Sequence, residues 1–181
     1  MVYIMLADGF EEAEAVIPAD LLRRAGIETA FLSLEEREVT GARGITITAQ
    51  LTLAEADTDN MEMLVLPGGM GGVENIQMNL FAMALIQKAF DKGCYLAALC
   101  AAPTILANIG ILDRRNAVCY PGMEGEMGSA VVQPGVPVVV SGRIITGEAL
   151  GSSFDFSLKL IEILKGKQAA DTVKNAIHYR H

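Results

Sequence analysis

The stretch over residues 94–109 changes character at a single cysteine, and this change constrains the fold more than any other feature. An apolar run over residues 94–99, too short for a free-standing helix, ends at Cys100. Small residues and Pro103 follow, before a helical pattern over residues 104–109. We therefore expect a buried strand, a tight turn and a helix, with the thiol of Cys100 at the turn.

A cysteine at such a turn is a candidate nucleophile. Unpaired backbone N–H groups and the positive end of the helix dipole favour the thiolate over the thiol. The alternative is a buried cysteine that packs as a small apolar side chain, which is the commoner role of this residue type. The choice between the two depends on the rest of the chain.

Strand patterns alternate with helix patterns along the sequence. Strands are expected over residues 2–7, 28–34, 63–66, 94–99, 117–119, 130–132, 136–140 and 143–146, helices over 10–25, 53–56, 79–92, 104–109, 152–164 and 168–177, and a hairpin over 39–47. This alternation predicts an α/β fold with a mainly parallel sheet covered on both faces. Ligands of such folds bind beyond the carboxyl ends of the strands. We expect residues 8–14, 67–72, Cys100 and 147–151 to meet there.

The composition narrows the classes of partner. The 181 residues fit one domain over residues 1–181, and a net charge of −8 argues against nucleic acid or anionic membrane as a partner. The three cysteines show neither a disulfide framework nor a metal-binding spacing, and no apolar stretch approaches the ~20 residues of a membrane span. The N-terminus lacks a basic leader, so a soluble cytoplasmic protein without a metal site is expected. Because both histidines, His178 and His181, lie near the C-terminus, a Cys–His dyad is not expected.

Glu14 falls in the middle of the apolar stripe of the first predicted helix. A carboxyl group that faces a core must be hydrogen-bonded or protonated, and burial raises its pKa. Pro18 lacks the N–H that would bond the Glu14 carbonyl, so the helix is expected to bend or open there. Alternatively, Glu14 lies at the edge of the stripe and reaches solvent. The neighbouring Glu11 and Glu12 are explained by the helix dipole alone.

A glycine cluster over residues 67–72 follows the third buried strand. It matches neither of the common nucleotide-binding glycine motifs, and the acidic loop after the first strand would repel phosphate. We expect its backbone N–H groups to approach a reacting atom near Cys100, such as an oxyanion. A plain flexible turn is the alternative.

Five segments together resemble the ThiJ/PfpI superfamily, specifically its DJ branch. They are residues 9–18, 23–27, 65–69, 98–104 and 151–156. The resemblance implies a flavodoxin-like three-layer sandwich of the class I glutamine amidotransferase-like type, and a homodimer. It also implies that Cys100 occupies a nucleophile elbow and that Glu14 is a protonated acid hydrogen-bonded to the thiolate or its oxidised form. The backbone of Gly68, Gly69 and Ala101 is then expected to line the site.

The sequence departs from the pattern of that branch around the expected pocket. Tyr120 stands where a histidine is common, and Glu148 stands in place of an arginine. Arg43 matches an arginine that often reaches this region, so these three residues are expected at the pocket. The protease-like branch has a histidine directly after the cysteine, where this chain has Ala101, so peptidase activity is not expected.

Two functions fit these residues. The first is a cofactor-independent, cysteine-dependent enzyme that acts on small reactive carbonyls, in the manner of a glyoxalase or deglycase, with Cys100 as nucleophile and Glu14 as proton carrier. The second is an oxidative-stress sensor or chaperone in which Cys100 is oxidised to a sulfinate. The same two residues serve both, so the sequence leaves the choice open.

Overall fold

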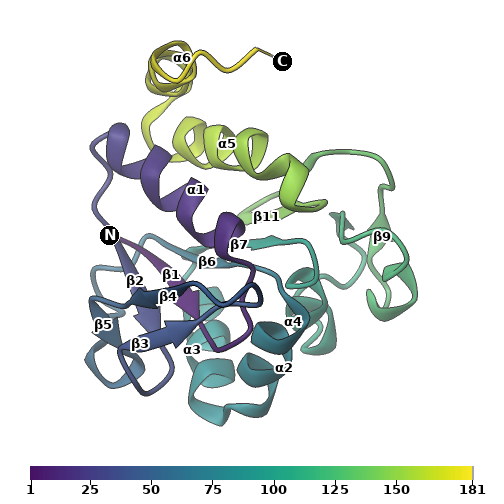
Figure 1. Ribbon diagram of the computed structural model, residues 1–181. Helices are drawn as coiled ribbons and strands as arrows, with labels where there is room; N and C mark the ends of the chain where they lie inside the picture. Colours follow the sequence, from purple (N-terminus) through teal and green to yellow (C-terminus); the bar gives the residue numbers. More distant parts are fainter. Residues whose placement is uncertain (181) are drawn as a thin grey trace.

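A computed structural model describes residues 1–180, so His181 lies outside the described residues. Its centre is a seven-stranded sheet in the order β10-β11-β7-β6-β1-β2-β5 (Figure 1). The strands are β1 (Val2–Leu6), β2 (Thr29–Ser33), β5 (Leu51–Thr52), β6 (Met63–Leu66), β7 (Tyr95–Leu99), β10 (Val138–Ser141) and β11 (Ile144–Gly147). All neighbouring strands are parallel except β10, which runs antiparallel to β11. The predicted α/β fold with a mainly parallel sheet is confirmed.

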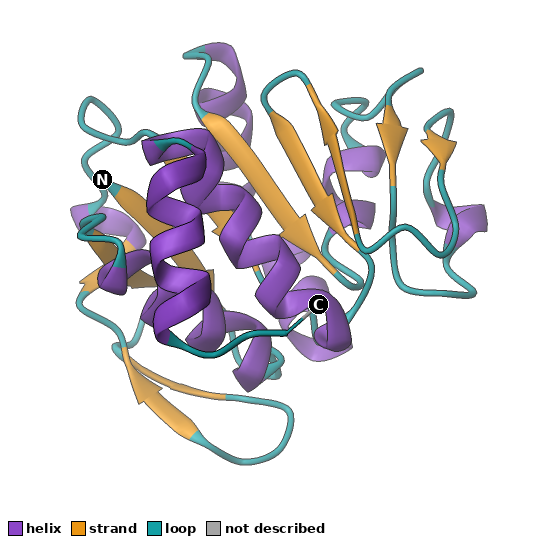
Figure 2. Ribbon diagram, turned by 90° about the horizontal axis from the view of Figure 1, so that it is seen from above, coloured by secondary structure: helices purple, strands orange, loops and turns teal. Residues whose placement is uncertain are grey.

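Helices cover both faces of the sheet. One face carries α1 (Glu12–Arg24), α5 (Ser153–Lys165) and α6 (Lys167–Ala176), and the other carries α2 (Met70–Met78), α3 (Leu80–Asp91) and α4 (Pro103–Asn108) (Figure 1). In Figure 2, α1 and α5 lie side by side across the strands. Two buried apolar clusters follow from this arrangement, one between the sheet and each helical layer. The molecule is therefore the three-layer sandwich that the sequence predicts.

The central strands are apolar along their whole length because neither of their faces meets water. Every residue of β1, β2 and β6 is buried. Strands of a sheet with one solvated face would instead alternate apolar and polar residues. This continuous pattern makes short buried strands recognisable in the sequence.

Smaller elements complete the fold. They are the hairpin strands β3 (Glu38–Thr40) and β4 (Thr46–Thr48), the strand pair β8 (Asn116–Ala117) and β9 (Val131–Val132), and the 3₁₀ turns η1 (Leu53–Glu55), η2 (Glu124–Glu126) and η3 (Leu150–Ser152). The hairpin pairs Val39 with Ile47, which confirms the hairpin predicted over residues 39–47. The short helix predicted over residues 53–56 is a single 3₁₀ turn.

Helix α2 was not expected from the sequence. It begins at Met70, inside the glycine cluster, although Gly71 and Gly72 are poor helix formers. These glycines allow close packing, because a Cβ on Gly72 would lie 2.8 Å from the Cα of Phe10. Tertiary contact therefore overrides local propensity at this helix start. The first helix also continues through Pro18 as one helical segment from residue 12 to residue 24.

Within residues 1–180, no helix combines the length and the apolar character that crossing a membrane requires.

Gly147, at the end of β11, permits the close approach of β7 and α5. A Cβ at this position would lie 2.2 Å from Leu99 Cδ1 and 2.9 Å from Phe156 Cδ2. We expect Gly147→Ala to lower the free energy of unfolding by about 1–3 kcal/mol in urea titrations, because it overpacks the core. Gly151→Ala is the matched control, since a Cβ there meets nothing within 4 Å. Equal stability of the two variants would contradict this packing argument.

Candidate active site

Cys100 lies at a sharp turn between β7 and α4, as the sequence predicts. Its φ of 64° is in the left-handed region, which non-glycine residues rarely adopt. Two backbone hydrogen bonds hold this conformation: Cys100 N–H donates to Gly147 O (3.0 Å) and Tyr120 N–H donates to Cys100 O (2.8 Å). Such strain persists only where the surroundings impose it, and it is common at functional sites.

A pocket of about 400 Å³ opens above the sulfur. It is lined by Glu11, Ala42, Arg43, Gly69, Met70, Gly71, Cys100, Ala101, Tyr120 and Met123. The structure thus brings four predicted site residues to Cys100, namely Arg43, Gly69, Ala101 and Tyr120. Met70, from the glycine segment expected at the site, and Met123, which the sequence analysis did not predict, supply apolar walls.

Glu14 is completely buried beneath this pocket, so the alternative of a side chain that reaches solvent is wrong. Its Oε2 accepts a hydrogen bond from Gly68 N–H (2.8 Å), and among the described residues its buried Oε1 has no hydrogen-bond partner. Burial raises the pKa of Glu14 to about 7, although Gly68 N–H and the Cys100 thiol act in the opposite direction. The nearby charge of Glu11 adds to the increase.

The thiol of Cys100 is less acidic than its position at a helix start suggests. Burial and the Glu14 carboxyl raise the pKa of Cys100 to about 12, while the N–H groups of Ala101 and Gly69 lower it. Burial and the adjacent carboxylate therefore oppose the helix start of α4, and the thiolate is disfavoured while Glu14 carries its charge. Two adjacent anions are costly, so the pair retains at least one proton at neutral pH.

The glycine loop is built for close approach to this pair and is not a plain flexible turn. A Cβ on Gly68 would lie 2.7 Å from both Cys100 Cβ and Glu14 Oε2. Gly69 has a φ of +87°, and a Cβ there would lie 2.4 Å from Gly9 O. Only glycine fits at either position.

Glu12 holds the hairpin turn against the pocket. This buried carboxylate accepts hydrogen bonds from Arg43 N–H (2.7 Å) and Ile45 N–H (3.3 Å). Burial alone would raise the pKa of Glu12, but these and other backbone donors lower it overall. The sequence-based explanation by the helix dipole missed this role, because the partner is distant along the chain. The Arg43 side chain itself is 74% exposed, with its guanidinium 3.9 Å from the Glu11 carboxylate.

Glu148 is not a pocket residue, which corrects the sequence-based expectation. Its carboxylate accepts a hydrogen bond from Gly135 N–H (2.9 Å), and its backbone N–H donates to Pro137 O (3.0 Å). Both bonds hold it against the turn before β10, beyond the lining of the Cys100 pocket. Of the segment 147–151 that was expected at the site, Gly147 contacts Cys100, because its carbonyl accepts the Cys100 N–H.

The other two cysteines lie outside the pocket. Cys94 donates from its thiol to Met61 O (3.1 Å), just before β7 begins and at the end of that strand remote from Cys100. Cys119 is buried, and burial followed by the charge of Glu124 raises its pKa to about 11. Within residues 1–180, no cluster of three or more His, Cys, Asp or Glu side chains is arranged to hold a metal ion.

A three-layer α/β sandwich with a strained cysteine between a central strand and a helix defines the flavodoxin-like, class I glutamine amidotransferase-like class. Residues 1–163 match the sequence model of the DJ-1/PfpI family, and the chain belongs to that family. The chain is 34% identical to the protein dj-1beta of Drosophila melanogaster over 96% of its own length and 94% of that protein. It is 32% identical to a Pyrococcus abyssi protein named deglycase, over 91% and 99% of the two chains. The structure matches oxidized Toxoplasma gondii DJ-1 with a TM-score of 0.93 at 31% identity, covering 99% and 98% of the two chains.

Glu14 makes stability depend on pH. Because its pKa in the folded protein, about 7, lies above the ordinary 4.5, the folded state binds more protons between these values. Its stabilising contribution is therefore fully present below pH 4.5 and is lost as the pH rises through 7. Across this window, the free energy of unfolding of the wild type should fall by about 2–3 kcal/mol more than that of Glu14→Gln. Parallel pH profiles for the two proteins would contradict the raised pKa.

Proposed function

We propose that the protein is a cysteine-dependent enzyme that acts on small reactive carbonyls, in the manner of a glyoxalase or deglycase. The observation that carries this proposal is the buried Glu14 carboxyl beneath the Cys100 thiol at the base of an open pocket. A proton carrier whose pKa is near 7 is well matched to general acid–base work at neutral pH. The similarity to a protein named deglycase supports the same class of chemistry.

The first step is addition of the sulfur to the aldehyde carbon of a 2-oxoaldehyde. Ionised Glu14 takes the thiol proton as the C–S bond forms, and returns it to the carbonyl oxygen to give a hemithioacetal. The N–H groups of Gly69 and Ala101 already act on the sulfur, and they lie where they can stabilise developing negative charge beside it. Glu14 then moves a proton from the first carbon to the second, and the hydroxyl proton on the first carbon's oxygen passes to the oxygen of the second carbon, which gives a thioester. Addition of water to the resulting thioester releases a 2-hydroxy acid and restores the thiol.

The pocket favours small substrates without a negative charge. It holds about 400 Å³, and Glu11 lies on its wall. Arg43 is the one cation that lines the pocket in the described part of the chain, and its exposed guanidinium is near the Glu11 carboxylate. With Tyr120 at the position where a histidine is common, Glu14 is the proton carrier that the pocket provides.

Turnover of methylglyoxal tests this proposal. We expect purified protein to convert methylglyoxal to lactate, Cys100→Ala to abolish the reaction, and Glu14→Gln to slow it by at least about 10²-fold. Cys94→Ala is the matched control and should retain wild-type activity, because its thiol lies at the other end of the same strand. Consumption no faster than with Cys100→Ala would overturn the enzymatic proposal.

A second candidate is a redox sensor in which Cys100 is oxidised to a sulfinate. The unpartnered Oε1 of Glu14 supports it, since a protonated carboxyl there would donate a hydrogen bond to an oxygen on the sulfur. The similar Toxoplasma gondii structure is of an oxidized protein. In this role no substrate is turned over, and the oxidised form would bind a partner.

Mass spectrometry after peroxide treatment tests the second candidate. We expect the wild type to gain two oxygen atoms, ~32 Da, on Cys100, with Cys94 and Cys119 unmodified. Glu14→Gln removes the acid that stabilises the sulfinate, so its oxidation should continue to the sulfonate or stop at a labile sulfenate. The same stable product in Glu14→Gln would exclude a stabilising role for Glu14.

We also propose that the protein forms a homodimer and is located in the cytoplasm. Helix α1 exposes Val16 and the hairpin turn exposes Ile45, so apolar surface is available for a second copy at this edge of the molecule. The basic residues Arg23 and Arg24 at the end of α1 are proposed to lie at the same contact.

A further inference from the structure

Three large apolar side chains stand in solvent at the junction of α2 and α3. Met78, Leu80 and Phe81, which we call the α2–α3 corner, are 81%, 82% and 80% exposed. Scattered apolar residues are normal on protein surfaces, but a contiguous group marks an interaction site. Asn79 lies between them and caps α3, because its Oδ1 accepts hydrogen bonds from the N–H groups of Phe81 and Ala82 (both 3.0 Å). This cap fixes the backbone of the corner at the start of α3.

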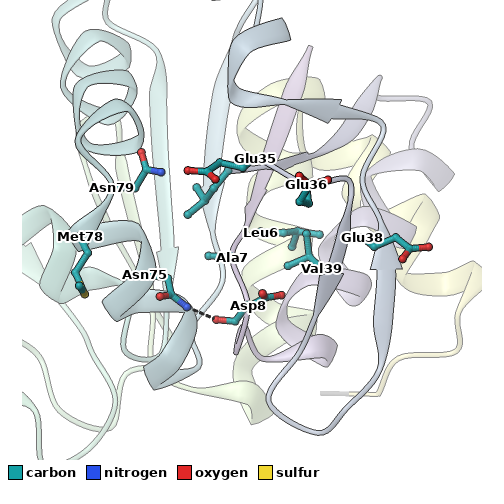
Figure 3. Close-up of a pocket in the computed structure, with 11 residues that line it drawn as sticks. Leu6, Ala7, Asp8, Glu35, Glu36, Glu38, Val39, Asn75, Met78 and Asn79 are labelled. Carbon is teal, nitrogen blue, oxygen red and sulfur yellow. Dashed lines mark hydrogen bonds between the residues drawn. The ribbon is translucent and has the colours of Figure 1, made fainter.

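Two cavities flank the corner and share three lining residues, Leu34, Glu35 and Asn79. The larger, of about 590 Å³, is an apolar groove whose walls include Leu53, Ala54, Ala56, Phe81, Ala84 and Leu85. The smaller, of about 370 Å³, has Leu6, Ala7 and Val39 in its lining and Met78 at its side (Figure 3). The exposed corner and the two cavities thus form one continuous surface.

The charged side chains beside this surface are mostly acidic. Asp8, Glu35, Glu36 and Glu38 line the smaller cavity, whereas the larger is lined by one cation, Lys88. In Figure 3 the carboxylate of Glu35 extends toward Asn79, next to the apolar corner. The ion pairs within residues 1–180 include none made by Glu35, Glu36 or Glu38. These carboxylates are available to a cation from outside.

We propose that this surface docks a basic amphipathic segment of a partner protein. An apolar side chain of the segment enters the groove beside Phe81 and Leu85, and a lysine or arginine next to it binds Glu35 and Glu36. This combination of an apolar groove and complementary charge is how short amphipathic segments are recognised. A second copy of this chain is a poor occupant of this surface, because the acidic side chains Glu35, Glu36 and Glu38 of the two molecules would come together.

The docking surface is separate from the cysteine site. Met70 and Gly71, at the start of α2, line the Cys100 pocket, whereas Met78 at the far end of the helix lines the smaller cavity. The lining residues of the Cys100 pocket and of the two cavities do not overlap within the described chain. We therefore expect Cys100→Ala to bind the segment as the wild type does. This expectation does not depend on whether the protein has the proposed enzymatic activity.

Fluorescence anisotropy with a designed probe tests the proposal. The probe is a labelled ~14-residue peptide of leucine and lysine with the leucines on one helical face, and the reference peptide replaces lysine by glutamate. We expect the lysine peptide to bind the wild type and Cys100→Ala alike. Binding should weaken at least about tenfold in Leu80→Ser/Phe81→Ser and in Glu35→Gln/Glu36→Gln. Raising the salt from about 0.05 to about 0.3 M should also weaken it.

Matched control variants distinguish specific binding at this surface from nonspecific binding of the peptide. Val131→Ser removes an exposed apolar side chain elsewhere, and Glu74→Gln removes a carboxylate on α2 that lines neither cavity. Both should bind within about twofold of the wild type. Equal binding of the glutamate peptide, or unchanged binding in both surface double variants, would overturn the proposal. So would concentration-dependent self-association that disappears in Leu80→Ser/Phe81→Ser while the lysine peptide fails to bind.

Discussion

The buried carboxyl of Glu14 beneath the Cys100 thiol is the interaction on which the rest of the site depends. An acid placed in an apolar helix face costs free energy unless it is hydrogen-bonded or neutral. Here one oxygen is satisfied by Gly68 N–H and the other is left unpartnered among the described residues. The pair therefore retains a proton, and that proton is available for transfer at the base of a pocket.

The surrounding architecture serves to bring these two groups together. Helix α1 supplies Glu14 and the end of β7 supplies Cys100, while the loop after β6 passes between them. Gly68 has no room for a side chain there, because its Cβ would contact both groups. The carbonyl of Gly147 holds Cys100 from the neighbouring strand. Four neighbouring segments of the sheet edge thus fix one geometry, as the carboxyl ends of parallel strands commonly do.

The sequence predicts the features that depend on local pattern. Continuous apolar runs identify β1, β6 and β7 because these strands are buried on both faces, and helical periodicity places Glu14 in the core. What it misses depends on contacts between distant segments. The first turn of helix α2 contains Gly71 and Gly72 because Gly9 and Phe10 pack closely against them. Glu12 binds a hairpin that is distant along the chain, and Glu148 turns toward Gly135. The acidity of Cys100 likewise depends on burial and on Glu14 of the first helix, which the local pattern around the cysteine does not contain.

The most direct measurement is the alkylation rate of Cys100 as a function of pH, followed by intact-protein mass in the wild type and in Glu14→Gln. Burial and, next to it, the Glu14 carboxyl raise the pKa of the thiol. Glutamine keeps the shape of the side chain and removes the charge, so the midpoint of the rate profile should move to lower pH in Glu14→Gln. A midpoint that is unchanged, or that moves to higher pH, would show that the two groups do not interact as the structure indicates.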